Sequence, residues 1–473
     1  MDPLAHSSLR GSFSGRLLTQ PEDMSAFLTD WRGKWKGRAL AVAQPDTTVD
    51  VANIVRWCNQ HGIPLVPQGG NTGLSGGGVP DDSGQALVIS LKRLNRIDAV
   101  DAMNNTVIAE AGCTLQQVQD AALHAGRLFP LSLAAEGSCT IGGNLATNAG
   151  GVHVLRYGNA RDLCLGLEVV TADGEIWDGL RGLRKDNTGY DLRDLYIGSE
   201  GTLGIITRAV LKLHPLPAAR VAALVAIASP VEALQLLQTF QRRASSKLSA
   251  FELFSDAGLG LVERHVPGSR CPFNDRHPWY VLIEISDEES HIKANETMES
   301  ALAHASDQGM VTDAVISNSE SQHASLWALR ENISESQSAE GKNIKHDVSV
   351  PISSISGFIE STLTLLRETF PTLRPIVFGH LGDGNLHFNI SPPTGARTAA
   401  DTEHFLSLEP SINRLIHDAT VCIGGSISAE HGLGVLRRDE AARYKSAIEL
   451  GLMKRIKSAL DPRGLMNPGK VLS

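Results

Sequence analysis

Glycine gathers in four short stretches of this chain, and three of them lie in its first half. The stretches span residues 69–78, 137–151, 198–204 and 379–384. A loop without side chains lets backbone N–H groups approach a ligand closely, and consecutive N–H groups form a nest that binds anions. Three such loops in one half of the chain therefore predict an extended polyanionic cofactor held by backbone.

The first loop, residues 67–80 (P-Q-G-G-N-T-G-L-S-G-G-G-V-P), follows an apolar run that predicts a strand. It contains neither the G-K-[ST] of a P-loop nor the G-x-G-x-x-G of a dinucleotide-binding unit. Taken alone, it is equally consistent with a merely flexible loop. The loops at 136–151 (E-G-S-C-T-I-G-G-N-L-A-T-N-A-G-G) and 198–207 (G-S-E-G-T-L-G-I-I-T) repeat its chemistry with hydroxyl and amide side chains, which favours cofactor binding.

The composition is typical of a soluble globular protein, with 42% hydrophobic and 20% charged residues among 473. This length predicts about two or three domains. The net charge of -9, without a stripe of basic residues, argues against a nucleic-acid partner. The six cysteines are scattered without a C-x-x-C pair, which indicates reduced thiols and excludes a thiolate zinc site. No apolar run approaches the length of a membrane span, so we expect an intracellular protein.

Short strands and helices alternate along the chain up to about residue 213, and again beyond it. Periodicity predicts helices at 48–58, 231–243 and 289–305, and strands at 63–66, 87–91, 167–171, 175–177, 221–228 and 280–286. The sequence H-P-L-P at 214–217 predicts a domain boundary between the two parts. The turn-rich residues 461–470 predict that the chain ends in a loop.

The fourth glycine stretch lies in F-G-H-L-G-D-G-N-L-H-F-N-I, residues 378–390. Strict alternation places His387 and Asn389 on one strand face and turns Leu386, Phe388 and Ile390 toward the core. A hairpin around the glycine turn would bring His380 close to His387. Two imidazoles alone are insufficient for a metal site, and such histidines are more often structural or superficial.

A third ligand has a candidate in Glu430, within S-A-E-H-G at 428–432. Two imidazoles and one carboxylate with an open fourth position are the composition of a catalytic zinc site. The same ligands also suit manganese, iron or cobalt. On the residues alone, a divalent-metal site made by His380, His387 and Glu430 therefore stays an alternative to a structural role for the histidines.

Two segments contain basic side chains that could bind an anionic substrate. Residues 327–334 predict a helix in which Arg330 and Ser334, four apart, are neighbours on one face. Arginine can grip a carboxylate with two parallel hydrogen bonds. Lys345 opens a strand-like segment in which it alternates with His346. On the residues alone, a solvated surface charge is the favoured interpretation of each.

The glycine strings, together with R-K-D-N-T-G-Y-D-L at 184–192, resemble the FAD domain of vanillyl-alcohol-oxidase-type flavoproteins. Within them, the chain is similar to FAD-linked D-2-hydroxy acid dehydrogenases from about residue 30 to its end. Gln68 stands where lactate- and glycolate-type relatives carry arginine, which favours the hydroxyglutarate branch. Residues 67–80 contain no His, Cys or Tyr to which a flavin could be attached, so we expect noncovalent FAD.

The resemblance implies an α+β fold with three parts. We expect an FAD-binding domain of two α+β subdomains at 1–216, and an α+β substrate (cap) domain at 217–424 that carries the metal hairpin. A mainly helical C-terminal segment at 425–473 would return to the FAD domain. The cofactor-binding residues that it implies are Pro67, Gln68, Gly69, Gly70, Asn71, Thr72, Gly73, Leu74, Gly76, Gly77, Glu136, Gly137, Ser138, Ile141, Gly142, Gly143, Asn144, Thr147, Asn148, Gly150, Gly201, Gly204, Ile205, Ile206 and Asn467.

The resemblance also implies roles in the second half of the chain. His380, His387 and Glu430 match metal ligands, and His431 matches a substrate-binding general base. The other matches to substrate contacts are Arg330, Ser334, Lys345 and Asn389, with serine at 334 where threonine is common.

The implied reaction is oxidation of D-2-hydroxyglutarate to 2-oxoglutarate by hydride transfer to the flavin, assisted by Zn²⁺, Mn²⁺ or Co²⁺. D-lactate, D-malate or another D-2-hydroxy acid remain alternative substrates. A metal-dependent hydrolase would not need the cofactor loops, and a flavin- or metal-binding module without turnover is the non-enzyme alternative.

The family implies an electron-transfer flavoprotein or a quinone as electron acceptor, rather than oxygen or NAD. It implies the cytoplasm for a bacterial chain and the mitochondrial matrix for a eukaryotic one. The oligomeric state stays open, a homodimer being the common case.

Overall fold

The computed structural model describes residues 3–396 and 398–473, and the chain divides into two compact units. The first contains Met1–Gly150, Gly158–Leu216 and Glu430–Ser473, and the second contains Gly151–Tyr157 and Pro217–Ala429. The break between Leu216 and Pro217 falls inside the H-P-L-P sequence. Two details differ from the expected ranges: the chain returns to the first unit at Glu430 rather than 425, and Gly151–Tyr157 belongs to the second unit.

Hydrogen bonds explain why the chain returns to the first unit at Glu430 and not at residue 425. Ser426 N donates to Ser349 O at 2.7 Å, and Ala429 N donates to Asp347 O at 3.2 Å. These bonds hold residues up to Ala429 beside a strand of the second unit.

The first unit contains two four-stranded sheets, ordered β1-β2-β4-β3 and β5-β9-β7-β8, and a small pair β6-β10. Its strands are β1 (Gly15–Leu18), β2 (Ala41–Pro45), β3 (Leu65–Gln68), β4 (Leu87–Ser90), β5 (Thr106–Glu110), β6 (Arg127–Leu128), β7 (Cys164–Thr171), β8 (Ile176–Gly179), β9 (Gly204–Lys212) and β10 (His214–Pro215). Its helices are α1 (Pro3–Ser12), α2 (Pro21–Met24), α3 (Thr48–His61), α4 (Leu115–His124), α5 (Ile141–Ala146), α7 (Arg193–Tyr196), α16 (Arg438–Tyr444) and α17 (Ala447–Leu460).

The two sheets differ in strand direction. In the first, β2 and β3 run parallel to β4, while β1 is antiparallel to β2. The second is antiparallel throughout, and β7 and β8, at the strands predicted for 167–171 and 175–177, form a hairpin. Val170 and Ile205 of the second sheet share a buried core with Leu87 and Ile89 of the first. The first glycine loop follows β3, and the third precedes β9.

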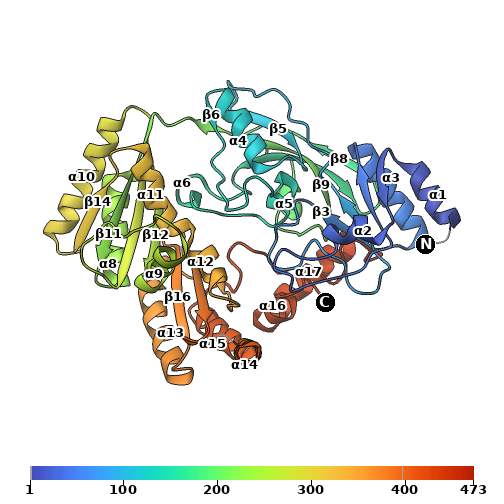
Figure 1. Ribbon diagram of the computed structural model, residues 1–473. Helices are drawn as coiled ribbons and strands as arrows, with labels where there is room; N and C mark the ends of the chain where they lie inside the picture. The colour runs from blue at the N-terminus through green and yellow to red at the C-terminus, as the bar shows by residue number, and fades with distance from the viewer. Residues whose placement is uncertain (1–2, 397) are drawn as a thin grey trace. The chain divides into compact units, whose positions relative to one another are not determined.

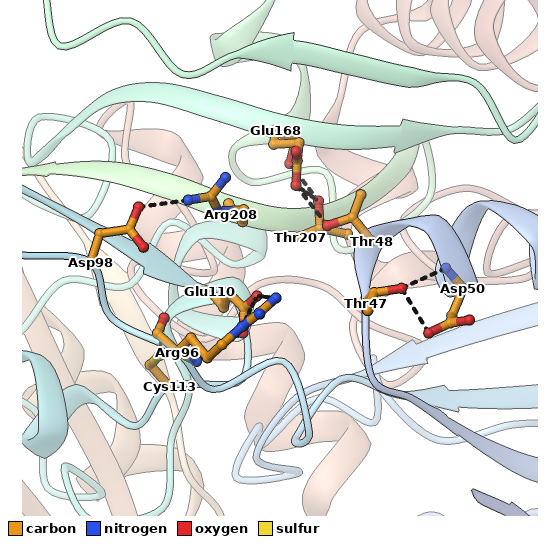
Figure 2. Close-up of polar contacts among 10 residues, drawn as sticks. All are labelled: Thr47, Thr48, Asp50, Arg96, Asp98, Glu110, Cys113, Glu168, Thr207 and Arg208. Atoms are coloured by element: carbon orange, nitrogen blue, oxygen red, sulfur yellow. Dashed lines mark hydrogen bonds and ion pairs between the residues drawn. The ribbon is translucent and has the colours of Figure 1, made fainter. Parts of the chain in front are cut away.

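Helix α3 confirms the predicted helix at 48–58 and continues to His61. Thr47 caps its N-terminus by accepting a hydrogen bond from Asp50 N, as Figure 2 shows. Gly62 ends it in the left-handed conformation, with φ of 65°, where glycine is the favoured residue. Both ends of the helix therefore follow from local sequence.

Glu168 of β7 links α3 to the second sheet (Figure 2). Its Oε1 accepts hydrogen bonds from Thr48 Oγ1 at 2.7 Å and from Thr207 Oγ1 of β9 at 2.9 Å. Nearby, Arg208 pairs with Asp98. This carboxylate of β7 thus connects α3 to β9, the strand that the third glycine loop enters.

The second unit is built on one antiparallel seven-stranded sheet, ordered β14-β11-β13-β12-β16-β17-β15 (Figure 1). Its strands are β11 (Ala219–Ile227), β12 (Leu248–Ser255), β13 (Trp279–Asp287), β14 (Asp313–Ile316), β15 (Asp347–Ser349), β16 (Arg374–His380) and β17 (Asn385–Ser391). Its helices are α6 (Val154–Tyr157), α8 (Pro230–Arg243), α9 (Asp256–His265), α10 (His291–Asp307), α11 (Glu320–Glu331), α12 (Ile333–Ala339), α13 (Ile355–Thr369), α14 (Ala399–Ser407) and α15 (Glu409–Cys422).

Helices cover both faces of this sheet, so each face has its own core. Helices α8, α10, α13 and α15 pack on one face, where Leu386, Phe388 and Ile390 are fully buried as predicted. Helices α9, α11 and α12 pack on the other. Among the described residues, no helix is both long and apolar enough to cross a membrane.

We predict that Glu168→Ala weakens the first unit. The substitution removes the carboxylate that accepts from the hydroxyls of Thr48 and Thr207. The fully buried Thr207 keeps only a longer hydrogen bond, 3.2 Å, to the backbone oxygen of residue 168. A buried group that loses its partner costs roughly 1 to 3 kcal/mol. Thermal unfolding should therefore begin at a lower temperature than in wild type. Glu175→Ala, at an exposed position next to β8, is the control, and an equal loss in both variants would contradict the assignment.

Candidate functional site

The glycine loops of the first unit meet around one cavity. The residues that line it are Asp30, Pro67, Gln68, Gly69, Gly70, Asn71, Thr72, Gly73, Ser75, Gly76, Gly77, Gly78, Val79, Leu91, Thr140, Gly142, Gly143, Asn144, Ala146, Thr147, Ser199, Glu200, Gly201, Gly204, Ile205 and Ile206. All three loops predicted from the glycine pattern therefore contribute to the same pocket.

Backbone contact between the first two loops is too close for side chains. A Cβ on Gly69 would lie 2.4 Å from Thr140 Oγ1, and a Cβ on Gly70 would lie 2.1 Å from the carbonyl oxygen of Ser138. Glycine at these positions lets the loops touch while their N–H groups stay accessible. The requirement explains why the predicted anion nest is glycine-rich.

Two polar atoms of the cavity wall fit a polar cofactor. Gln68 donates from Nε2 to Phe27 O and Gly78 O, but its buried Oε1 makes no hydrogen bond within the described chain. The buried Thr140 Oγ1 likewise makes none. Buried oxygens without partners are uncommon, and they are the kind of group that a bound cofactor satisfies.

Several residues predicted to bind cofactor lie outside the lining of this cavity: Leu74, Glu136, Gly137, Ser138, Ile141, Asn148, Gly150 and Asn467. Some of them support the loops instead. Glu136 accepts from Ser132 and Gln119. Asn467 Nδ2 donates to Gly77 O and to Glu200 O, which ties the first loop to the third.

Ser75, Thr140 and Glu200 also line the cavity and were not predicted to bind cofactor, although all three belong to the glycine motifs. Glu200 accepts from Leu433 N at 2.7 Å and from Gly434 N at 2.8 Å. Burial raises the pKa of its carboxyl despite these two donors. Ser75 Oγ donates to His431 O at 3.0 Å. The cavity wall therefore holds the segment that contains the predicted general base.

Glu430, next to His431, also lies against a glycine loop of the first unit. A Cβ on Gly150 would stand 2.8 Å from Glu430 Oε1. Gly150, predicted to bind cofactor, thus packs against the carboxylate that was predicted to bind metal.

The hairpin of β16 and β17 brings the two predicted histidine ligands together. His387 pairs with Phe378, and His380 pairs with Asn385, so both side chains lie on the same sheet face. Their ring centroids are 5.7 Å apart. Burial raises the pKa of Asp383, in the turn, to about 6. The hairpin therefore places the two predicted histidine ligands side by side on one face of the sheet.

A buried carboxylate that the sequence analysis did not single out contacts this hairpin. Glu252 of β12 accepts from His380 Nδ1 at 2.7 Å. Its other oxygen lies 2.8 Å from Nη2 of Arg330, on α11. Burial would raise the pKa of Glu252, but the charges of His380 and Arg330 hold it below its usual value. An acidic residue within the apolar A-F-E-L-F of β12 was the only sequence signal.

The predicted helix at 327–334 is wrong in its extent, because it is broken at Asn332. Helix α11 ends at Glu331, and α12 begins at Ile333. Asn332 Nδ2 donates to Ala328 O, and its ψ of 0° does not continue the helix. Arg330 is buried on α11, whereas Ser334 is half-buried on α12.

The last two predicted substrate contacts lie near β15 and β17. Asn389 donates from Nδ2 to Gln337 and accepts from His346 N, so protein groups already engage its amide. Lys345 is half-buried and precedes β15, which begins at Asp347. Asp347 pairs with His387 across the strands.

Two family models match the chain. One, described as "FAD linked oxidases, C-terminal domain", matches residues 216–471, and one described as "FAD binding domain" matches residues 39–179. The first of these matches starts at the break between Leu216 and Pro217.

Curated relatives match over nearly the full length. A D-2-hydroxyglutarate dehydrogenase of Xanthomonas citri pv. viticola is 42% identical over 96% of this chain and 94% of its own. A mitochondrial D-2-hydroxyglutarate dehydrogenase of Bos taurus is 38% identical over 97% and 81%. Among solved structures, p-cresol methylhydroxylase is similar with a TM-score of 0.77 at 15% identity, over 99% of this chain and 96% of that one. This last likeness concerns the fold alone.

We predict that Gly70→Ala lowers flavin content. The new Cβ would push the first loop away from Ser138 O and open the cofactor cavity. Gly11→Ala, at an exposed position of α1, is the control, because no atom lies within 4 Å of its Cβ position. The ratio of flavin to protein absorbance in the purified variants measures the effect. Full flavin content in Gly70→Ala would contradict the role of close loop contact.

Proposed function

This chain belongs to the D-2-hydroxyglutarate dehydrogenase family of FAD-linked oxidases, and we propose that it oxidises D-2-hydroxyglutarate to 2-oxoglutarate. The observation that carries the proposal is the cavity formed by the three glycine loops, together with the His431 segment bound to its wall. FAD held in this cavity would accept the hydride from C2 of the hydroxy acid.

The protein contribution to this step is a proton acceptor. His431 would take the proton of the substrate hydroxyl, and imidazole suits this role because its ordinary pKa lies near working pH. Hydrogen bonds from Ser75 to His431 O and from Leu433 and Gly434 to Glu200 hold the backbone around it. The backbone of the base would thus be fixed relative to the cofactor loops.

We also propose a divalent-metal site made by His380, His387 and Glu430, with Zn²⁺ as the first candidate and Mn²⁺ or Co²⁺ as alternatives. Because Nδ1 of His380 donates to Glu252, Nε2 is the nitrogen with which His380 would ligate an ion. Glu430 follows Ala429, which is hydrogen-bonded to Asp347 beside His387. The ion would supply a positive charge that makes the substrate hydroxyl more acidic.

Substrate carboxylates would be bound by Arg330, Ser334, Lys345 and Asn389. The strongest support concerns Arg330, whose Nε is buried and makes no hydrogen bond within the described chain. Its guanidinium therefore keeps a donor for an anion. A cation for the distal carboxylate would distinguish hydroxyglutarate from D-lactate, the alternative substrate.

Three further features extend the proposal. The family resemblance supports an electron-transfer flavoprotein or a quinone as electron acceptor. The same resemblance supports the cytoplasm in a bacterium or the mitochondrial matrix in a eukaryote, and a homodimer is the assembly to test first.

An anaerobic titration tests the proposal. Flavin absorbance of the purified protein should bleach on addition of D-2-hydroxyglutarate, chelation should prevent bleaching, and Zn²⁺ should restore it. D-lactate and D-malate follow as comparison substrates. A yellow protein that bleaches only with one of these would reject hydroxyglutarate, and a colourless protein that takes up no FAD would reject the whole function.

We predict that His387→Ala abolishes oxidation and leaves flavin content unchanged, because His387 is not among the residues that line the glycine-loop cavity. Stopped-flow absorbance and the flavin-to-protein ratio measure the two effects. His291→Ala, at an exposed helix start, is the control. Wild-type turnover in His387→Ala would reject the metal site.

We predict that Lys345→Met raises KM for D-2-hydroxyglutarate about tenfold or more and changes KM for D-lactate much less. A lost charged contact is worth roughly 1.5 to 3 kcal/mol, which corresponds to such a change. Steady-state kinetics with an artificial electron acceptor provide the measurement. The exposed Lys342→Met is the control, and equal changes with both substrates would remove Lys345 from the distal-carboxylate site.

A further inference from the structure

Glu252 occupies a position in the second unit that no predicted role explains. It lies on β12 opposite His380 of β16, and its side chain is fully buried on the sheet face covered by α9 and α11. Its neighbours along that face of β12 are Ala250 and Phe254, both buried. An ionised carboxylate in such surroundings requires partners of opposite charge.

Each carboxylate oxygen contacts a different functional candidate. Oε1 accepts from His380 Nδ1 at 2.7 Å, and Oε2 lies 2.8 Å from Arg330 Nη2. The guanidinium also lies over the ring of Phe378, at 4.8 Å from its centroid. One carboxylate therefore joins the candidate metal hairpin to the helix that carries the candidate substrate cation.

The contact with His380 determines which ring nitrogen is protonated. A carboxylate accepts a proton donor and cannot donate, so Nδ1 carries the hydrogen and Nε2 has the lone pair. This bond also orients the ring and makes Nε2 a stronger electron donor. Removal of such a carboxylate typically costs 10- to 100-fold in metal affinity.

The contact with Arg330 neutralises a guanidinium that is only 6% exposed. The contact is an ion pair, and Nη2 and Nε of Arg330 are both buried without a hydrogen bond in the described chain. The charge stays paired in the absence of an anion, and a donor remains for one. Glu252 thus holds the guanidinium in place without using all of its donors.

We propose that Glu252 is a positioning residue that orients both the metal ligand His380 and the substrate cation Arg330. The inference rests on the proposed function, and it adds a coupling between the metal site and the substrate-binding arginine. A change at Glu252 should alter both the affinity for the metal ion and the affinity for the substrate carboxylate. Glu252 would contact neither the ion nor the substrate itself.

The neighbouring strand offers a matched control in Glu284 of β13. This carboxylate is equally buried on the same sheet face, at 1% exposure. It accepts from His323 Nε2 at 3.0 Å, from Trp327 Nε1 at 3.0 Å and from Ser249 Oγ at 2.7 Å. Glu284 shares the burial and the histidine contact of Glu252 but has no contact with a predicted ligand.

The test compares Glu252→Gln with Glu284→Gln in the full-length flavoprotein. Competition with a chromophoric chelator gives the Zn²⁺ affinity without turnover. We expect a 10- to 100-fold loss for Glu252→Gln and less than a threefold change for Glu284→Gln. KM for D-2-hydroxyglutarate should rise in Glu252→Gln more than KM for D-lactate, with flavin content unchanged in both variants.

Wild-type Zn²⁺ affinity in Glu252→Gln would overturn the inference and leave the proposed function intact. If wild type itself binds no Zn²⁺, the metal part of the proposed function fails first. An equal loss in the two variants would also overturn the inference, because general destabilisation of the sheet would then explain it.

A second variant keeps the inference testable if Glu252→Gln does not fold because Arg330 loses its counter-charge. Glu252→Gln combined with Arg330→Gln removes both charges and retains an acceptor for His380 Nδ1. Reduced Zn²⁺ affinity of this folded double variant, relative to Arg330→Gln alone, supports the role of the carboxylate. Equal affinities would overturn it.

Discussion

The first unit depends on backbone contact that excludes side chains. A Cβ on Gly70 would lie 2.1 Å from the Ser138 carbonyl oxygen, and one on Gly434 would lie 2.1 Å from the Ser75 carbonyl oxygen. The first contact joins two cofactor loops, and the second joins the returning chain to the first loop. Because glycine stands at both contacts, the backbones can approach this closely. The loops can therefore form one cavity wall and hold the His431 segment against it.

The second unit depends on charges buried in a sheet that is covered on both faces. Strand alternation turns one side of the β16–β17 hairpin into an apolar core and the other toward β12 and α11. On that second side, the charges of Glu252 and Arg330 compensate each other, and His380 donates a hydrogen bond to the carboxylate. The desolvation cost of each charge is offset only while the partners stay in contact, so helix, strand and hairpin are held in one arrangement.

Prediction from the sequence succeeded where the cause is local. Alternation around His387 gave the correct strand face, since successive side chains in a strand point to opposite sides. Glycine spacing identified the loops that form the cavity. The helix break at Asn332 was missed, because a side-chain bond to Ala328 competes there with the helical pattern. Glu252 was missed because its partners are 78 and 128 residues away in sequence.

By itself, the sequence determined the family, the strand and helix pattern, the three cofactor loops and the two histidines of the hairpin. These features follow from short-range periodicity, from glycine at close contacts and from residue types in fixed spacing. Only the tertiary structure decided that Glu136 and Asn467 support the loops, that Glu200 holds the segment after His431, and that Glu252 joins His380 to Arg330. Those contacts unite residues far apart in the chain, and the packing of sheets and helices alone brings them together.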